Sequence, residues 1–510
     1  MNNFFIFIIG LYLSIVACKR PSETAISEDF CALIQEKGGG LNIEDVLPVQ
    51  DSTAVNGSGA FVLEEGDLSM MVRAWLTQHA TRSIDIQYFI FSVDNIGLIA
   101  CDYLVRAADR GVKVRILVDD IMVEADEEDI LVMDAHENIE IKIYNPGINI
   151  GKNLPVKLTK IVTDFKDINR RMHNKIFIAD RQAAITGGRN IADEYFDYDH
   201  EYNFRDRDIL LTGKVIEDMQ HSFEEFWNHK LSVPISTLIK GDSTKLYAPE
   251  RYDKLHQYAC NPDNYWPPIR EKINRLPSHL DSIKKSETFI FTDSIYYISD
   301  KPGKNINSKS WSGDGITSEA LTDLFVSAQS TVDIQTPYLI TTPEVRKLFK
   351  NAVQRGIKVR ILTNSLASTD NVEAFSGYQR DRKALLATGV SVFEYKPDAA
   401  IRKVIMTGAL QEKLDYTPVF GLHAKTMVID GRITVIGTFN LDPRSAHLNT
   451  ECITVVHSES LSKKVLRGME EEFKPENSWQ TTSDFNPDHM VGTAKRIKTL
   501  TRRIIPKNIL

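Results

Sequence analysis

The stretch His173-Asn-Lys-Ile-Phe-Ile-Ala-Asp180 has a second copy in this chain of 510 residues. The copy reads His423-Ala-Lys-Thr-Met-Val-Ile-Asp430 and begins 250 positions later. The residues between each lysine and aspartate are apolar or β-branched, which is typical of a buried strand. Residues i and i+2 of a strand point to the same face, so we expect each histidine to lie beside its lysine.

A second pair of segments repeats at nearly the same distance. Arg110-Gly-Val-Lys-Val-Arg-Ile-Leu117 and Arg355-Gly-Ile-Lys-Val-Arg-Ile-Leu362 differ at one position and lie 245 residues apart. Each follows a helical pattern (96–108 and 345–354), which itself follows a run of strand formers (83–91 and 330–340). A duplicated strand–helix–strand unit predicts an α/β fold in two halves, with mixed or mostly parallel sheets flanked by helices. We expect a pseudo-twofold axis and one shared active site.

The repeat, together with the composition of the two ends, predicts how the chain is divided. The expected parts are a signal peptide with a lipobox (1–18), a linker (19–60), a first half (61–231), a connecting segment (232–315), a second half (316–480) and a basic C-terminal tail (481–510).

Composition excludes several classes of protein. The chain has 42% hydrophobic and 25% charged residues, which is ordinary for a globular protein and unlike a disordered, collagen-like or polytopic membrane chain. Its 61 Lys and Arg against 69 Asp and Glu give a formal net charge of −8. This mild acidity argues against a general nucleic-acid binder, which normally carries a basic excess.

The N-terminus carries an apolar run from Phe4 to Ala17. The run is shorter than the roughly 20 residues of a spanning helix and has the length of a signal-peptide core. Ile15-Val-Ala-Cys18 resembles a bacterial lipobox, so we expect Cys18 to be lipidated and to anchor the chain at the periplasmic face of a bacterial membrane. Met1-Asn-Asn3 has no Lys or Arg, which leaves an uncleaved short anchor or a chance apolar start open.

The C-terminal stretch Lys495–Leu510 contains six basic residues and no acidic one. Four Ile and Leu side chains recur between them at spacings close to helical. A basic amphipathic tail of this kind fits the surface of an anionic bilayer. A solvated chain end is the alternative interpretation.

Each copy of the motif has further polar residues downstream. Asn190 and Asn440 both follow their histidine by 17 positions, and the acidic residues Asp206 and Glu451 come after them. Paired histidines, lysines and asparagines would attract an anion with several oxygens, above all a phosphodiester. A lysine beside a histidine disfavours a metal site. Because these side chains would meet the phosphate charge, neither a metal nor an organic cofactor is implied. One histidine can attack phosphorus while the other protonates the leaving alcohol, each oriented by a carboxylate.

These features closely resemble those of the phospholipase D superfamily. The two motifs, the segments Gly187-Gly-Arg-Asn190 and Gly437-Thr-Phe-Asn440, and the duplicated halves carry the resemblance, which covers Phe61 to Phe473. Within the superfamily the chain looks most similar to bacterial cardiolipin synthases of the C type and to phospholipase D-like lipoproteins.

The resemblance implies a role for each matching residue. His173 would be the nucleophile that forms a phosphohistidine, and His423 the general acid and later the base. The remaining roles are phosphate binding (Lys175, Lys425, Asn190 and Asn440), orientation of His423 by Glu451 and of His173 by Asp206, and support of the loops (Asp180 and Asp430). Many members have serine two positions before the asparagine, where this chain has Gly188 and Thr438. We therefore expect one donor in the first half to be missing or replaced by a backbone N–H.

The function that the resemblance implies is transfer of a phosphatidyl group to a second phospholipid, giving cardiolipin when phosphatidylglycerol is the acceptor. Hydrolysis to phosphatidic acid stays open, as do, less favoured, a nuclease and a non-catalytic lipid-binding protein. The expected partners are phospholipid substrates and a membrane surface. No nucleic acid is expected, and no obligate protein partner is inferred.

Overall fold

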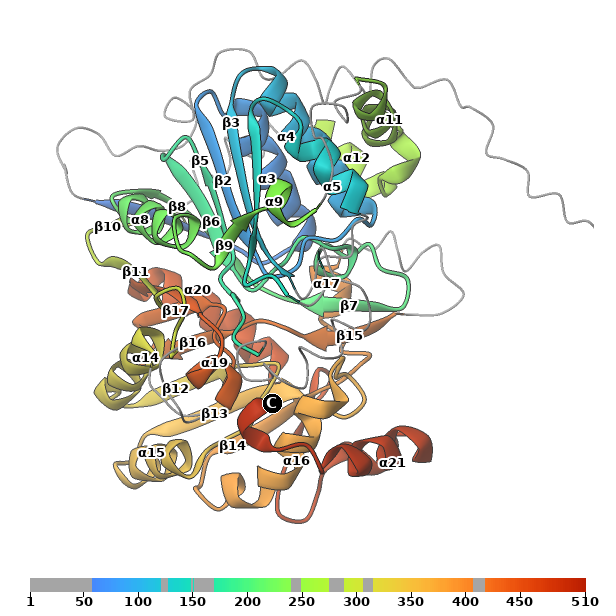
Figure 1. Ribbon diagram of the computed structural model, residues 1–510. Coiled ribbons are helices and arrows are strands. Elements are labelled where there is room, and N and C mark those ends of the chain that lie inside the picture. Colours follow the sequence, from blue (N-terminus) through green and yellow to red (C-terminus); the bar gives the residue numbers. More distant parts are fainter. Residues whose placement is uncertain are drawn as a thin grey trace, which may run out of the picture.

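The computed structural model describes residues 57–120, 127–147, 150, 169–239, 249–274, 289–305, 315–406 and 418–510. Cys18, the expected signal peptide and nearly all of the expected linker lie outside these residues. Two α/β halves lie against each other, with the first half in blue to green and the second in yellow to red (Figure 1). The linker was expected to reach residue 60, but the first described strand already begins at Ser58.

The first half is built on a nine-stranded sheet in the order β10-β1-β8-β6-β5-β2-β3-β4-β9. Its strands are β1 (Ser58–Leu63), β2 (Ser83–Tyr88), β3 (Lys113–Asp119), β4 (Ile139–Tyr144), β5 (Ile176–Ala179), β6 (Ala183–Gly187), β8 (Asp208–Gly213), β9 (Ser232–Pro234) and β10 (Ile290–Thr292). The helices of this half include α3 (Gly66–His79), α4 (Asn95–Asp109), α5 (Glu127–Asp134), α8 (Val215–Trp227) and α9 (Ile235–Leu238). The connecting segment adds α11 (Pro249–Cys260) and α12 (Pro267–Asn274).

The second half is built on an eight-stranded sheet in the order β11-β18-β17-β16-β12-β13-β14-β19. Its strands are β11 (Ile295–Ser299), β12 (Thr331–Gln335), β13 (Lys358–Asn364), β14 (Ser391–Tyr395), β16 (Thr426–Ile429), β17 (Ile433–Gly437), β18 (Cys452–His457) and β19 (Ser478–Thr481). The helices are α14 (Ile316–Ser327), α15 (Pro343–Gln354), α16 (Val372–Leu386), α17 (Arg402–Ile405), α19 (Pro443–His447), α20 (Glu459–Glu472) and α21 (Thr493–Arg502).

The two sheets have the same order of strands. Eight strands of the first sheet, β1-β8-β6-β5-β2-β3-β4-β9, correspond one by one to β11-β18-β17-β16-β12-β13-β14-β19. The predicted duplication and the mixed α/β sheets are therefore confirmed. Within these two sheets, as far as the structure describes them, most neighbouring strands are antiparallel, however, and the parallel neighbours are β2–β3–β4 and β12–β13–β14.

A tight hairpin after each motif strand makes one of the antiparallel pairs in each sheet, β5–β6 and β16–β17. Asp180 and Arg181 both have positive φ (52° and 59°), and Gln182 donates its N–H to the carbonyl of Ala179. Asp430 and Gly431 make the same turn between β16 and β17, with φ of 52° and 62°. Two consecutive left-handed residues form the turn type that joins antiparallel strands, so the chain returns at once instead of crossing over through a helix.

The two halves are held together by main-chain pairing and buried charges. Strand β7 (Tyr202–Arg205) of the first half pairs in parallel with β15 (Val419–Leu422) of the second. The buried side chain of Arg205 pairs with Glu472 across the junction and with Glu64, 2.5 Å away. Although burial opposes ionisation of Glu64, Arg207 and Arg205 lower its pKa to about 2. A buried ion pair of this kind is costly to break, so the halves are fixed relative to each other.

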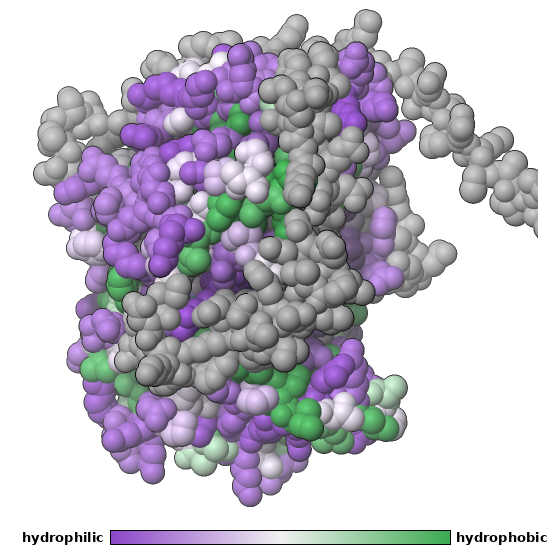
Figure 2. Space-filling view, viewed as in Figure 1, coloured by the Kyte–Doolittle hydropathy of each residue, from purple (hydrophilic) through white to green (hydrophobic). Residues whose placement is uncertain are grey.

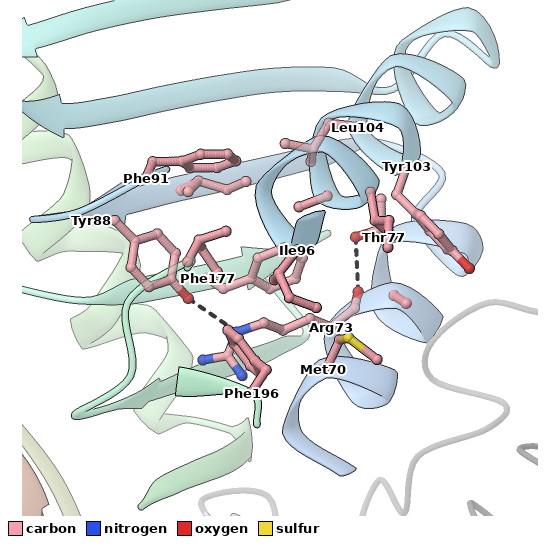
Figure 3. A pocket seen from close by; sticks show the side chains of 15 residues that line it. Met70, Arg73, Thr77, Tyr88, Phe91, Ile96, Tyr103, Leu104, Phe177 and Phe196 are labelled. Carbon is pink, nitrogen blue, oxygen red and sulfur yellow. Dashed lines mark hydrogen bonds between the residues drawn. The ribbon is translucent and has the colours of Figure 1, made fainter. Parts of the chain in front are cut away.

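The core of the first half contains an apolar cavity between α3, α4 and β2 (Figure 3). Arg73 crosses it: its Nε donates to the Tyr88 hydroxyl (3.1 Å) and its Nη2 to Asp208 (2.9 Å). Neither motif histidine lines this cavity, so it is separate from the site described below. Among the described residues, no helix combines the length and the apolar character needed to cross a bilayer.

Candidate active site

Each His-Lys pair lies in the segment that leads into its strand, rather than in the strand itself. The strands begin at Ile176 and Thr426, one residue after each lysine. The leading segments pair instead with the opposite half: the N–H of His173 donates to the carbonyl of Thr450 (3.0 Å), and that of His423 to the carbonyl of Arg205 (2.8 Å). The two motifs are thus positioned by main-chain bonds that cross the junction.

The carboxylates cross the junction as well. His173 Nδ1 lies 2.7 Å from Glu451 Oε2, and His423 Nδ1 lies 2.6 Å from Asp206 Oδ2. The expected pairing of Glu451 with His423 and of Asp206 with His173 is therefore wrong. Each carboxylate directly follows the residue whose carbonyl receives the histidine N–H of the other half. The crossed backbone pairing consequently delivers each carboxylate to the opposite imidazole.

Both imidazoles are neutral at ordinary pH. Burial lowers the pKa of His173 to about 4, and burial together with the charge of Lys425 lowers that of His423 to about 3. Burial alone would raise the pKa of the two carboxyls, but the facing imidazoles and nearby lysines hold it below its usual range. A carboxylate only accepts hydrogen bonds, so each Nδ1 donates. The Nε2 lone pair of His173 has no donor among the described residues, whereas that of His423 faces Lys425 Nζ.

The two lysines lie beside their histidines, as the spacing predicts. Lys175 Nζ donates to the carbonyl of His173 (2.9 Å), and Lys425 Nζ donates to that of His423 (2.5 Å) and lies 3.1 Å from its Nε2. Burial lowers the pKa of Lys175 to about 7, with the charge of Lys425 acting in the same direction. Burial likewise lowers the pKa of Lys425 to about 8. Two buried cations that repel each other would gain from the arrival of a multivalent anion.

The two asparagines are also buried. The Asn190 Oδ1 accepts the N–H of Ile90 (3.1 Å), and its side chain hydrogen-bonds to the Tyr195 hydroxyl. The Asn440 Oδ1 is buried and accepts no hydrogen bond in the described part of the chain. A buried amide oxygen without a donor costs free energy, which a donor on a bound ligand, such as the hydroxyl of an acceptor alcohol, would recover. The same described residues contain no group of three or more His, Cys, Asp or Glu placed to hold a metal ion.

The motif aspartates face away from this site, in keeping with the supporting role expected for them. The Asp180 carboxylate accepts the N–H groups of Thr81 (2.8 Å), Arg82 (2.7 Å) and Ser83 (2.9 Å) at the start of β2. Asp430 does the same for residues 329–331 at the start of β12. Each aspartate therefore ties the turn after a motif strand to the beginning of its neighbour.

Replacing Asp180 with alanine is expected to lower stability much more than catalysis. The variant leaves three backbone N–H groups without their acceptor and places alanine at a positive φ, which together cost about 2 to 4 kcal/mol. We expect a lower thermal midpoint by calorimetry and a turnover within about threefold of the parent. Asp180→Asn, which tolerates the left-handed conformation and keeps one acceptor oxygen, is the matched control with a smaller loss. A loss of turnover at unchanged stability would contradict this role.

Of the two alternatives expected for the first half, the structure at Gly188 fits the missing donor. A Cβ at this position would lie 2.0 Å from Asp206 Oδ1, so the carboxylate occupies the space that a serine side chain would need. The Gly188 N–H donates to the carbonyl of Arg207 and does not replace the missing donor. In the second half the Thr438 hydroxyl accepts the N–H of Cys452 (2.9 Å). Glycine at position 188 is thus what allows Asp206 to reach His423.

Several aromatic and polar residues of the site received no role from the sequence. Phe89 contacts the ring of His173 edge-on (5.2 Å between centroids), and Tyr195 and Phe204 contact His423 at 5.1 and 4.7 Å. The Ser445 hydroxyl donates to the second oxygen of Glu451 (2.8 Å). Phe204 precedes Asp206 by two positions, and Tyr195 follows Asn190 by five. Their short distance in sequence from predicted site residues is the signal that could have placed them in the site.

Comparison with known proteins identifies the family. The family model described as "Cardiolipin synthase, PLD-like domain" matches twice, over residues 76–227 and 321–474. Together the two matches cover more than half of the chain, one in each structural half. The chain belongs to this phospholipase D-like family. Within it, the chain is 32% identical to cardiolipin synthase C of Escherichia coli (strain K12) over 415 residues, which is 80% of this chain and 83% of that protein.

Two further comparisons place the phospholipase D-like chain among its relatives. It is 35% identical over 424 residues to an uncharacterized protein of Helicobacter pylori (strain ATCC 700392 / 26695), covering 83% of this chain and 80% of that one. Among solved structures, the phosphatidylserine synthase of Haemophilus influenzae Rd KW20 superposes with a TM-score of 0.57 at 13% identity, covering 90% and 97% of the two chains. This structural likeness concerns the fold.

Proposed function

We propose that this chain is a phosphatidyltransferase that joins two phospholipids through a phosphohistidine, in the manner of a cardiolipin synthase. The observation that supports it best is the pair of crossed His–carboxylate contacts, His173 with Glu451 and His423 with Asp206. Two imidazoles, each oriented by a carboxylate at Nδ1, suit a reaction in which one forms a covalent bond through Nε2 and the other moves protons.

In the first step, His173 Nε2 attacks the phosphorus of a bound phospholipid. A P–N bond forms, the P–O bond to the headgroup alcohol breaks, and His423 Nε2 gives its proton to the departing oxygen. The negative charge of the bound phosphodiester raises the pKa of His423 from its low value in the free protein, so this proton is present in the complex. Lys175, Lys425, Asn190 and Asn440 hold the non-bridging oxygens.

In the second step, His423 acts as a base. It takes the proton of an acceptor hydroxyl, whose oxygen forms a new P–O bond while the P–N bond to His173 breaks. A hydroxyl of phosphatidylglycerol as acceptor gives cardiolipin, and water gives phosphatidic acid. The name of the E. coli relative, cardiolipin synthase C, supports the lipid acceptor. A nuclease is disfavoured by the net charge of −8.

The direct test is to incubate the purified full-length chain with phosphatidylglycerol vesicles and follow the lipids by mass spectrometry. We expect cardiolipin and an equal amount of glycerol. Phosphatidic acid as the sole product would replace the proposal with hydrolysis. Nicking of plasmid DNA at low salt, without conversion of lipid, would replace it with a nuclease.

The pKa values of the site lysines and histidines predict how activity depends on pH. Above pH 7 to 8 the free protein loses the charges of Lys175 and then Lys425, which weakens phosphate binding. We expect kcat/KM to fall through this range, while kcat holds to higher pH because the bound phosphodiester raises both pKa values. Below about pH 4 His173 becomes protonated and loses its nucleophilic lone pair, which lowers kcat/KM. Above that pH the free protein loses the proton of His423, the general acid, so kcat/KM already declines with rising pH before the lysines titrate. A kcat/KM that still rises above pH 9 would contradict this account.

We also propose that Cys18 carries a lipid that holds the protein on the periplasmic face of a bacterial membrane. The lipobox-like tetrapeptide ending at Cys18 supports this, and the residue lies outside the described part of the chain. Growth with a labelled fatty acid should label the parent protein and leave Cys18→Ser unlabelled. Equal labelling of both proteins would exclude this anchor.

A further inference from the structure

The helix α21 (Thr493–Arg502) and the turn after it have an inverted distribution of side chains. Ile497, Leu500 and Ile504 are 55%, 53% and 87% exposed, whereas the polar Thr499 is buried. Ile497 and Leu500 are three residues apart and so share one side of α21, and Ile504 follows in the turn after the helix ends at Arg502. A surface helix normally turns its apolar side to the protein core. Here the apolar stripe of Ile497, Leu500 and Ile504 points to solvent.

The stripe is not a loose chain end, because polar contacts fix the helix to the second half. α21 lies on α16, where Arg502 pairs with Glu373 (2.8 Å) and Arg503 donates to Gln379 (2.7 Å). Arg380 in turn donates to the carbonyl of Arg503 (2.9 Å). These bonds hold the polar side against the protein and so keep the apolar stripe outward.

The surroundings of the stripe are strongly basic. Lys495–Leu510 carries six Lys and Arg and no Asp or Glu. Arg496 and Lys498 are exposed beside the stripe and form no ion pair within the part of the chain that the structure describes. Figure 2 shows green, hydrophobic side chains among purple ones at the lower right, where α21 lies. An apolar strip bordered by free cations is complementary to an anionic lipid surface.

We propose that α21 docks on a bilayer that contains anionic lipids, with Ile497, Leu500 and Ile504 inserted at the boundary between headgroups and acyl chains. Arg496 and Lys498 then meet lipid phosphates. Scattered exposed apolar residues are common and need no explanation. A row of three beside two exposed cations, Arg496 and Lys498, on a helix whose polar side is already bound, is different. A nucleic acid would leave the apolar row in water, and bilayer insertion removes it from water.

Helix α21 also lies near the part of the candidate active site that contains His423. Lys495 Nζ lies 3.3 Å from the carbonyl of Thr369. The next residue, Asp370, accepts the Tyr338 hydroxyl (2.7 Å), and its charge partly opposes the lowering of the Lys425 pKa by burial. A bilayer under α21 would therefore lie next to the loop that reaches the active site. Docking goes beyond the proposed reaction and does not depend on it.

The test places an environment-sensitive fluorophore on the full-length chain at Leu500→Cys. The control carries the same label at Val326→Cys on α14, a residue with a similar exposure of 47%. The parent protein, treated identically, corrects for label on native cysteines. Vesicles contain either phosphatidylcholine alone or equal parts of phosphatidylcholine and phosphatidylglycerol. We expect a blue shift at position 500 with the anionic vesicles only, and none at position 326.

Replacing the two cations beside the stripe with neutral residues measures how much electrostatic attraction contributes to vesicle binding. Arg496→Gln and Lys498→Gln are each expected to weaken vesicle binding of α21 about fivefold. The shift should persist in a His173→Ala background, so loss of the reaction and loss of docking are separable. The proposal is overturned by an unchanged spectrum at position 500 while the protein floats with vesicles, or by equal shifts at 500 and 326. It is also overturned by equal shifts with both vesicle types, by no vesicle binding at all, or by a concentration-dependent shift without vesicles, which would indicate self-association.

Discussion

Replacing His423 with alanine is expected to abolish turnover of natural phospholipids while leaving the nucleophile intact. The loss should reach about 10⁴-fold, because the departing alkoxide no longer receives a proton. A donor with a nitrophenyl leaving group does not need that proton. With it, His423→Ala should release about one equivalent of nitrophenolate per protein and then stop, since no base activates the acceptor. Stopped-flow absorbance measures the burst.

His173→Ala is the matched control for this experiment. It removes the attacking Nε2, so neither the natural nor the activated donor should react, and no burst should appear. Mass spectrometry of the His423→Ala protein after the burst should find the phosphatidyl group on His173. Exchanged behaviour of the two variants, with a burst in His173→Ala, would reverse the roles of the histidines and leave the rest of the site unchanged. Circular dichroism and thermal midpoints establish that both variants fold.

The paired motifs could be predicted from sequence because their information is local. A histidine and lysine two positions apart, repeated at the offset of the duplicated halves, fix the fold class and most site residues. The antiparallel majority of strands was missed, although Asp430-Gly431 between two apolar runs is a recognised hairpin signal. Its counterpart Asp180-Arg181 makes the same turn without a glycine, so the sequence there carries no hairpin signal.

The partners of the histidines could not be predicted from sequence. Asp206 and Glu451 lie at comparable distances downstream of their own motifs, so spacing favours pairing within each half. What decides the pairing is how the halves dock: β7 aligns with β15, and Met172 with Thr450, across the junction. The pattern of residues along a single strand does not indicate how strands of the two halves align with each other. An active site built from crossed pairs also needs both halves in place, so neither half alone has an oriented imidazole.

The crossed pairing makes Glu451→Gln a sharp test of the site. The substitution is almost isosteric, but the amide presents an N–H₂ or a weaker acceptor where His173 Nδ1 now donates to a carboxylate. With an amide donor facing Nδ1, the ring proton moves to Nε2 and removes the lone pair that attacks phosphorus. We expect kcat to fall about 10³- to 10⁴-fold with little change in stability. Ser445→Ala, which removes only the 2.8 Å bond to the other oxygen of Glu451, should cost no more than about tenfold.

Nitrogen NMR of histidine-labelled protein distinguishes crossed pairing from pairing within a half. Because Glu451 contacts His173, Glu451→Gln should change the tautomer signals of His173 and leave those of His423 in place. Asp206→Asn should do the reverse, since Asp206 contacts His423 across the junction. If Glu451→Gln instead moved the His423 signals, the crossed arrangement would be wrong. A site that depends on these contacts is made only when both halves dock, so the proposed reaction requires both motifs.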